Sequence, residues 1–213
     1  MKKSINYLCF IVTFLFFSNT AYSQYTKWET DVTYNDIEFK KIRFKIQETD
    51  TTYAEGILKQ NTIVEGYPCH KKIVFTRNWK LRQFLLAENH FMLGAEFPKE
   101  SRIIFGKDHI SCFLGKDTQI NGYLCNGNYA KWYSTGISTS FYPSGKLKCF
   151  YPDDDVEINN ILCKSSPFAG VCLHENGNLK QCKLTKDEII NGKEYKKNTE
   201  LIFDETGLVI SEK

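Results

Sequence analysis

The stretch Asp117-Thr-Gln-Ile120-Asn-Gly122-Tyr-Leu-Cys125 decides the fold, because its spacing returns along the chain. An aspartate or asparagine is followed by an aliphatic residue three positions on and by glycine or asparagine five positions on. Cysteine or an aromatic residue follows eight positions on. The other copies begin at Asn61, Asn89, Asp155 and Asp187 and end at Cys69, Phe97, Cys163 and Tyr195.

A second motif follows each copy. Phe141-Tyr-Pro-Ser-Gly145-Lys-Leu147 is matched by Leu173 to Leu179 and by Phe203 to Val209. Its glycine supplies the positive φ of a tight hairpin turn. In the first motif the Asp or Asn side chain is expected to cap its own turn. The residues between the two motifs are β-branched and aromatic, without a stripe of helical period, so they predict strands.

The repeat therefore predicts an all-β fold, an antiparallel meander of about five β-hairpin units behind an N-terminal cap. Two strands per unit give an elongated sheet of roughly ten to twelve strands. The cap covers residues 24–60, with strands expected at 37–47 and 52–58. The units start near residues 61, 89, 117, 155 and 187, and residues 24–213 form one domain.

The segments Phe141 to Leu147 and His174-Glu-Asn-Gly-Asn-Leu179 resemble the core of bacterial MORN-repeat variants, a family of β-hairpin repeat proteins. The resemblance covers mainly residues 136–213. It implies a hairpin-repeat architecture, and some members of the family are labelled antitoxin-like.

The first 23 residues are typical of a secretory signal. Lys2 and Lys3 precede an apolar run from Tyr7 to Phe17, and Ala21-Tyr22-Ser23 has small residues where signal peptidase needs them. The apolar run is too short to span a bilayer comfortably, so no permanent membrane anchor is expected. The sequence predicts export to the periplasm, the cell surface or the medium.

The charge of the chain is nearly balanced. It holds 28 basic and 25 acidic side chains, and removal of the signal takes away Lys2 and Lys3 and no acid. The lysines are interleaved with acids, a pattern that favours a solvated strand face over a nucleic-acid site. No nucleic-acid partner is expected.

The cysteines leave two interpretations open. Cysteines flank the turns at Asp117, Asp155 and Gly177, which would allow disulfides between neighbouring strands in an exported protein. They would otherwise be reduced and fill core positions that other units give to Phe97 or Tyr195. The candidate pairs are Cys112–Cys125, Cys149–Cys163 and Cys172–Cys182, which leaves Cys69 free.

No motif indicates catalysis. The chain lacks the spacings of metalloproteases, serine hydrolases and phosphate-binding loops, and its histidines occupy unrelated repeat positions. Cys69 and His70 are adjacent on a strand and should face opposite ways. Asp153, Asp154 and Asp155 lack calcium-loop spacing. We expect no cofactor, no metal and no catalytic residue.

The insertion in the third unit is the strongest candidate for a binding loop. It mixes glycines with Tyr129, Trp132 and Tyr133, and insertions in repeat proteins often lie on the binding face. The residues themselves favour the other interpretation, an extended hairpin whose aromatics turn inward.

The sequence favours a non-enzymatic binding or scaffold protein of the bacterial cell envelope, with a protein or glycan partner. An immunity or antitoxin-like partner of a toxin, and a hydrolase acting on the envelope, are the alternatives.

Overall fold

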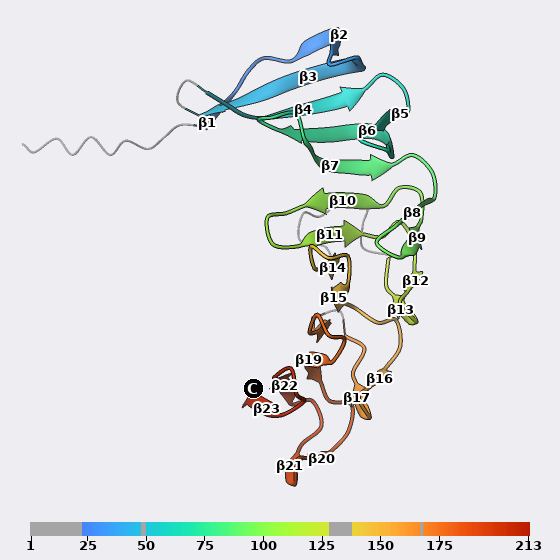
Figure 1. Ribbon diagram of the computed structural model, residues 1–213, viewed down its shortest axis with the longest axis vertical. Helices are drawn as coiled ribbons and strands as arrows, with labels where there is room; N and C mark the ends of the chain where they lie inside the picture. The colour runs from blue at the N-terminus through green and yellow to red at the C-terminus, as the bar shows by residue number, and fades with distance from the viewer. Residues whose placement is uncertain (1–22, 48–49, 128–137, 167) are drawn as a thin grey trace, which may run out of the picture.

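The computed structural model describes residues 23–47, 50–127, 138–166 and 168–213, and the predicted signal segment before Ser23 lies outside them. All the secondary-structure elements in these residues are β-strands. None of them forms a helix long and apolar enough to cross a membrane. The predicted fold class is confirmed: an elongated antiparallel meander of hairpin strands (Figure 1).

One large sheet of fifteen strands runs the length of the described chain. It follows the chain from β1 to β23, and β2 and β5 pair with β3 and β6 at its side. Its N-terminal strands are β1 (Ser23–Tyr25), β2 (Glu29–Tyr34), β3 (Ile37–Gln47), β4 (Asp50–Leu58), β5 (Thr62–Val64), β6 (Tyr67–Thr76) and β7 (Leu81–Leu86). It continues with β10 (Arg102–Phe105), β11 (Ile110–Phe113), β14 (Thr139–Phe141), β15 (Leu147–Phe150), β18 (Val171–Leu173), β19 (Leu179–Lys183), β22 (Glu200–Phe203) and β23 (Val209–Glu212).

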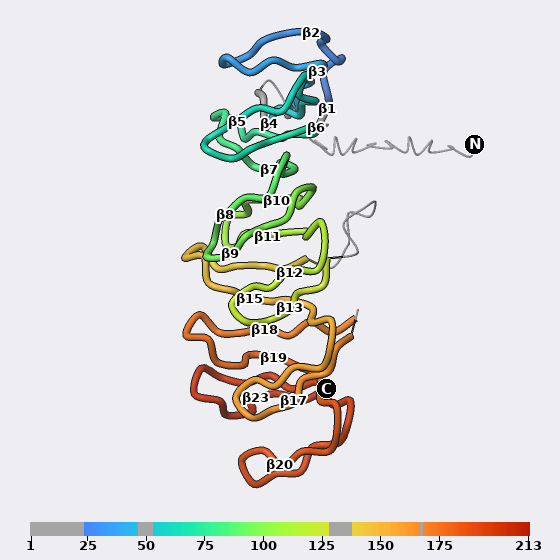
Figure 2. Tube along the Cα trace, turned by 90° about the vertical axis from the view of Figure 1, so that its right-hand side faces the viewer, coloured from blue at the N-terminus to red at the C-terminus, as the bar shows by residue number. Residues whose placement is uncertain are grey.

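The repeated acid-to-cysteine motif forms short hairpins of its own, which corrects the expectation that it is a plain connecting turn. Four of these hairpins leave the sheet entirely, and the β5–β6 hairpin is their counterpart in the first unit. Figure 2 shows them following one another along the sheet. They are β8 (His90–Met92) with β9 (Ala95–Phe97), β12 (Thr118–Ile120) with β13 (Tyr123–Cys125), β16 (Val156–Ile158) with β17 (Ile161–Cys163), and β20 (Glu188–Ile190) with β21 (Lys193–Tyr195).

The turn of each short hairpin explains the Asn-Gly signature. Asn121 and Gly122 have φ values of 51° and 85°, and a two-residue turn with both φ positive matches the twist of the strands it joins. Glycine and asparagine adopt that region most easily. The predicted turn positions are confirmed, since all five have positive φ: Gly66, Gly94, Gly122, Asn160 and Gly192.

The first residue of the motif closes the excursion that carries the short hairpin. Asp155 Oδ1 accepts a hydrogen bond from the backbone N–H of Ser165 at 2.7 Å, ten residues on. The expected cap of the local turn is therefore wrong, because the side chain bonds where the chain returns to the sheet. The same bond joins Asn89 to Lys99, Asp117 to Gly127 and Asp187 to Lys197.

The core lies between the sheet and the short hairpins. Position eight of the motif is buried in every unit, at Cys69, Phe97, Cys125, Cys163 and Tyr195. Phe97 packs on Phe141 of the sheet with ring centroids 5.7 Å apart, and Tyr123 stacks on Phe150 at 4.9 Å. Burial of these rings stabilises the contact between the two layers. None of the short hairpins in the described residues lies over the opposite face of the sheet.

We expect Asp155→Ala to lower the free energy of unfolding by about 1.5–3 kcal/mol, the usual value of a hydrogen bond to a charged group. Urea unfolding at neutral pH measures the change. Asp154→Ala is the matched control, because Asp154 is exposed and makes no side-chain hydrogen bond within the described residues. Equal losses in both variants would mean that the closing bond contributes nothing.

Candidate functional site

The predicted binding loop lies outside the described residues. Tyr129, Trp132 and Tyr133 fall within 128–137, between β13 and β14, so the loop stays a prediction.

The disulfide joins two neighbouring strands of the large sheet. Cys149 on β15 lies directly opposite Cys172 on β18, and their Sγ atoms are bonded. The expected partners were wrong because the Asp155 motif forms a separate hairpin, so the sheet neighbour of β15 is the next long strand. The pairs that the structure does not form are Cys112–Cys125, Cys149–Cys163 and Cys172–Cys182.

The other described cysteines serve as core residues. Burial raises the pKa of the Cys69 and Cys125 thiols to about 12, and burial also raises the pKa of Cys112. A hydrogen bond with Cys182 and burial together raise the pKa of Cys163. Thiols with raised pKa values hold their protons at neutral pH and make poor nucleophiles.

The histidine next to Cys69 is engaged elsewhere. His70 Nε2 lies 3.0 Å from Glu100 Oε2, while Cys69 Sγ donates to the carbonyl of Tyr67. Within the described residues, no group of three or more His, Cys, Asp or Glu side chains is placed to hold a metal ion.

The surface with the most distinctive chemistry lies on the uncovered face of the N-terminal strands. Lys41, Arg43 and Lys45 alternate along β3, so all three share one face. Ile42, between Lys41 and Arg43 in the strand, is buried and points to the core on the opposite face. The register places Ile57, Glu55 and Tyr53 of β4 beside these cations.

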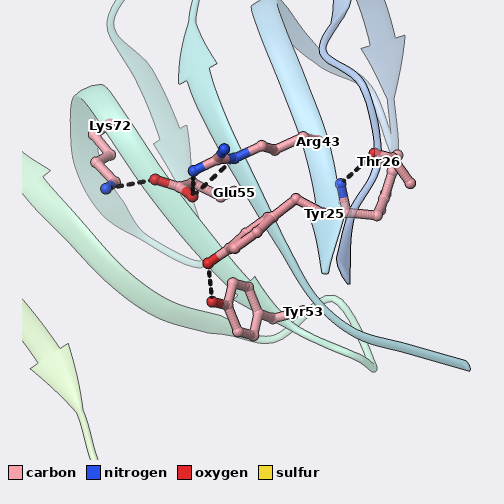
Figure 3. Close-up of polar contacts among 7 residues, drawn as sticks. Tyr25, Thr26, Arg43, Tyr53, Glu55 and Lys72 are labelled. Carbon is pink, nitrogen blue, oxygen red and sulfur yellow. Dashed lines mark hydrogen bonds and ion pairs between the residues drawn. The ribbon is translucent and has the colours of Figure 1, made fainter. Parts of the chain in front are cut away.

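Glu55 is the centre of this surface. Arg43 donates to its carboxylate from Nη2 at 2.8 Å, and the Lys72 ammonium lies 2.5 Å from the other oxygen. Figure 3 shows the two cations reaching the carboxylate from either side. Burial acts to raise the pKa of Glu55, but the hydrogen bonds from Lys72 and Arg43 outweigh it and the pKa lies below its ordinary value of 4.5.

Aromatic rings hold the neighbouring cations in place. The guanidinium of Arg43 lies 4.0 Å from the ring centroid of Tyr25 and 4.6 Å from that of Trp28. Lys41 is also over Trp28, at 4.6 Å. Such contacts fix long cationic side chains that would otherwise sample many rotamers.

Tyr53 extends the same arrangement toward the next strands. Lys45 Nζ lies 5.1 Å from the Tyr53 ring centroid, and the Arg82 guanidinium lies 5.8 Å from it. The hydroxyl groups of Tyr53 and Tyr25 are hydrogen-bonded to each other, and this bond raises the pKa of Tyr25 (Figure 3).

One further cation lies on β10. Arg102 is over the ring of Phe113 at 4.0 Å, and burial lowers its pKa. Its Nε has no hydrogen-bond partner in the described part of the chain. We call the whole surface the cationic face: Lys41, Arg43, Lys45, Lys72, Arg82 and Arg102, with Tyr25, Trp28 and Tyr53.

The cationic face is strongly unbalanced in charge. Along the paired rows that run from Lys41, Arg43 and Lys45 across β4 to β6, Glu55 is the single carboxylate. Arg43 and Lys72 already neutralise it. Lys41 and Arg82 add further positive charge to the same surface.

Sequence reasoning missed this surface because lysines and acids alternate in the linear chain. The period-two spacing of Lys41, Arg43 and Lys45 was a usable signal. Their neighbours Tyr53 and Lys72 come from other strands, and only the register brings them together.

Replacing Glu55 tests the electrostatics of the cationic face. Because the folded pKa lies below 4.5, the charged carboxylate stabilises the fold above that pH, and the stabilisation is lost as pH falls through the folded pKa. We expect Glu55→Gln to cost about 1–2 kcal/mol at pH 7 and to flatten the loss of stability toward pH 3. Urea unfolding across that range measures both. Glu157→Gln is the exposed control, and an unaltered pH profile in Glu55→Gln would contradict the assignment.

Reduction of the disulfide should also destabilise the fold. The bond closes a sequence separation of 23 residues. Its loss in a Cys149→Ala, Cys172→Ala double variant should cost about 3 kcal/mol by loop-closure entropy. Wild-type protein unfolded in urea with dithiothreitol should match the variant, and identical midpoints with and without reductant would show that the bond has no effect.

Comparison with known proteins gave no match to a family model, a curated protein or a solved structure. The resemblance to MORN-repeat variants therefore stays a prediction from the residues that carry it.

Proposed function

We propose that the chain is an exported, non-enzymatic binding protein of the bacterial cell envelope, and that its cationic face holds an acidic polysaccharide. The observation that carries this proposal is the charge imbalance of the described rows from β3 to β6, in which the one carboxylate, Glu55, already pairs with Arg43 and Lys72. Buried thiols with raised pKa values favour a binding role over thiol chemistry.

The shape of the surface suits an extended ligand. The cations lie on β3, β6 and β7 of one antiparallel sheet. Its strands are about 4.8 Å apart, so the face from β3 to β7 is roughly 15–20 Å wide. A polymer with carboxylate or phosphate groups can pair with several of them at once, and separate weak contacts then add through effective concentration.

The aromatic residues favour a glycan over a nucleic acid. Single-stranded nucleic acids bind by stacking bases on open ring faces. Here Arg43 and Lys41 lie over Trp28, and Arg43 also lies over Tyr25. The rings therefore orient cations, and the near-neutral net charge of the chain supplies little long-range attraction for nucleic acid.

Titration calorimetry of residues 24–213 with oligogalacturonate at low ionic strength tests the proposal. We expect Lys41→Gln with Arg82→Gln to weaken binding about tenfold, because two charge-assisted contacts are lost. Raising the salt concentration should weaken wild-type binding as well.

The matched control is Lys148→Gln with Lys180→Gln, which removes the same charge from the C-terminal strands β15 and β19. This variant should bind as wild type does. Equal weakening in both variants, wild-type binding to neutral dextran, or tighter binding to a single-stranded oligonucleotide would contradict the proposal.

A further inference from the structure

The short hairpins present a second surface, on the side of the molecule that faces away from the sheet. In each hairpin the central residues of the two strands form one cross-strand pair on the side away from the core, because the flanking positions point to the core. In the first hairpin Ile63 is exposed and its partner Pro68 is buried. These pairs are Ile63–Pro68, Phe91–Glu96, Gln119–Leu124, Glu157–Leu162 and Ile189–Glu194.

An aliphatic or aromatic side chain points outward in every pair. Ile63 and Ile189 are 75% exposed and Phe91 is 71% exposed, although solvent-facing strand positions are usually polar. Leu124 is also exposed, and Leu162 is half-buried. We call this row the apolar ridge: Ile63, Phe91, Leu124, Leu162 and Ile189. Ile63, Phe91 and Ile189 lie on the first strand of their hairpins, and Leu124 and Leu162 lie on the second strand. A row of large apolar groups at the outward positions of successive repeats is the pattern of a docking surface.

Carboxylates accompany the ridge. Glu96 lies opposite Phe91, and Glu157 lies opposite Leu162. Both glutamates are exposed and neither forms an ion pair within the described chain. Asp153 and Asp154 are exposed just before the Glu157 hairpin. The complement of this surface is apolar and cationic.

A second copy of the chain fits poorly. Two ridges packed antiparallel about a two-fold axis place the second unit opposite the fourth. Glu96 of one copy would then face the Glu157 hairpin of the other, and like charges would repel. A cationic partner would instead form ion pairs with both glutamates.

The spacing of the ridge indicates the conformation of the partner. Each unit adds two sheet strands, so the ridge advances about 9.6 Å per unit. A polyproline II segment advances about 9.3 Å in three residues and returns the same face. In a β-strand, side chains three residues apart point to opposite faces, so they could not all contact the ridge. A helical heptad advances about 10.5 Å, so the apolar positions of a helix would lose register with the ridge over successive units.

We propose that the apolar ridge docks an extended basic segment of another protein, with an apolar residue at every third position and Lys or Arg between. Its apolar side chains would pack beside Ile63, Phe91 and Ile189, and its cations would pair with Glu96 and Glu157. This surface is independent of the cationic face, so the molecule would join an anionic polymer on one side to a basic protein on the other.

The test uses a fluorescent peptide of five Leu-Pro-Lys repeats and residues 24–213 of the chain, with binding measured by anisotropy. A triple variant, Ile63→Thr, Phe91→Thr and Ile189→Thr, should bind about tenfold more weakly or worse, because the contact residues lose most of their apolar surface. Threonine keeps the strand preference of these positions. Urea unfolding checks that the variant folds.

Two comparisons make the result specific. Leu208→Thr with Ile210→Thr removes two other exposed apolar groups, which lie outside the ridge, and should leave binding unchanged. Glu96→Gln with Glu157→Gln should weaken binding and reduce its salt dependence. A Leu-Pro-Glu peptide should not bind.

Wild-type affinity in the triple variant would overturn the proposal, as would equal binding of the Leu-Pro-Glu peptide. Sedimentation velocity of the protein alone gives a further decision. A concentration-dependent dimer that the triple variant abolishes would identify a second copy as the occupant and reject the basic segment.

Discussion

The hydrogen bond between the first residue of the motif and the backbone N–H ten residues on, formed in four of the five units, is the constraint on which the fold depends. It fixes where the chain leaves the sheet and where it returns, at Asn89, Asp117, Asp155 and Asp187. The residues between these points are held as a hairpin. Their length and two-residue turn with positive φ give the hairpin one inward face, which covers the core side of the sheet.

This closure gives the molecule two surfaces of different chemistry, one charged and one apolar. One side of the sheet is occupied by the short hairpins and carries Phe84, Phe141, Phe150 and Phe203 in the core. The other side has no such cover and can carry charge. The cationic face uses the uncovered side of the N-terminal strands, and the apolar ridge uses the outer side of the hairpins. The apolar ridge depends on the repeat, because successive units present outward side chains on their short hairpins, whereas most of the cationic face lies on the cap strands β3 and β4.

The sequence was informative where the signal is local. The positive-φ positions at Gly122, Gly145 and Gly177 could be recognised from turn chemistry alone, and so could the two cap strands. It was less informative about pairing. The nine residues from Asp117 to Cys125 could form either a turn between sheet strands or a separate hairpin. Only the packing of Cys125 against the sheet selects the hairpin. Because that choice sets which strands are neighbours, it also decided that Cys149 bonds to Cys172. The charge imbalance of the cationic face depends on the register of β3, β4 and β6, so composition hides it.

The most direct test that the cationic face binds the anionic polymer is backbone amide NMR of residues 24–213 during titration with oligogalacturonate. The account predicts that chemical shifts change progressively on β3, β4, β6 and β7, around Arg43, Tyr53 and Arg82. Amides of β18 to β23 and of the short hairpins should stay in place. Shifts concentrated on the hairpins or the C-terminal strands, with the β3 to β7 face unaffected, would contradict it.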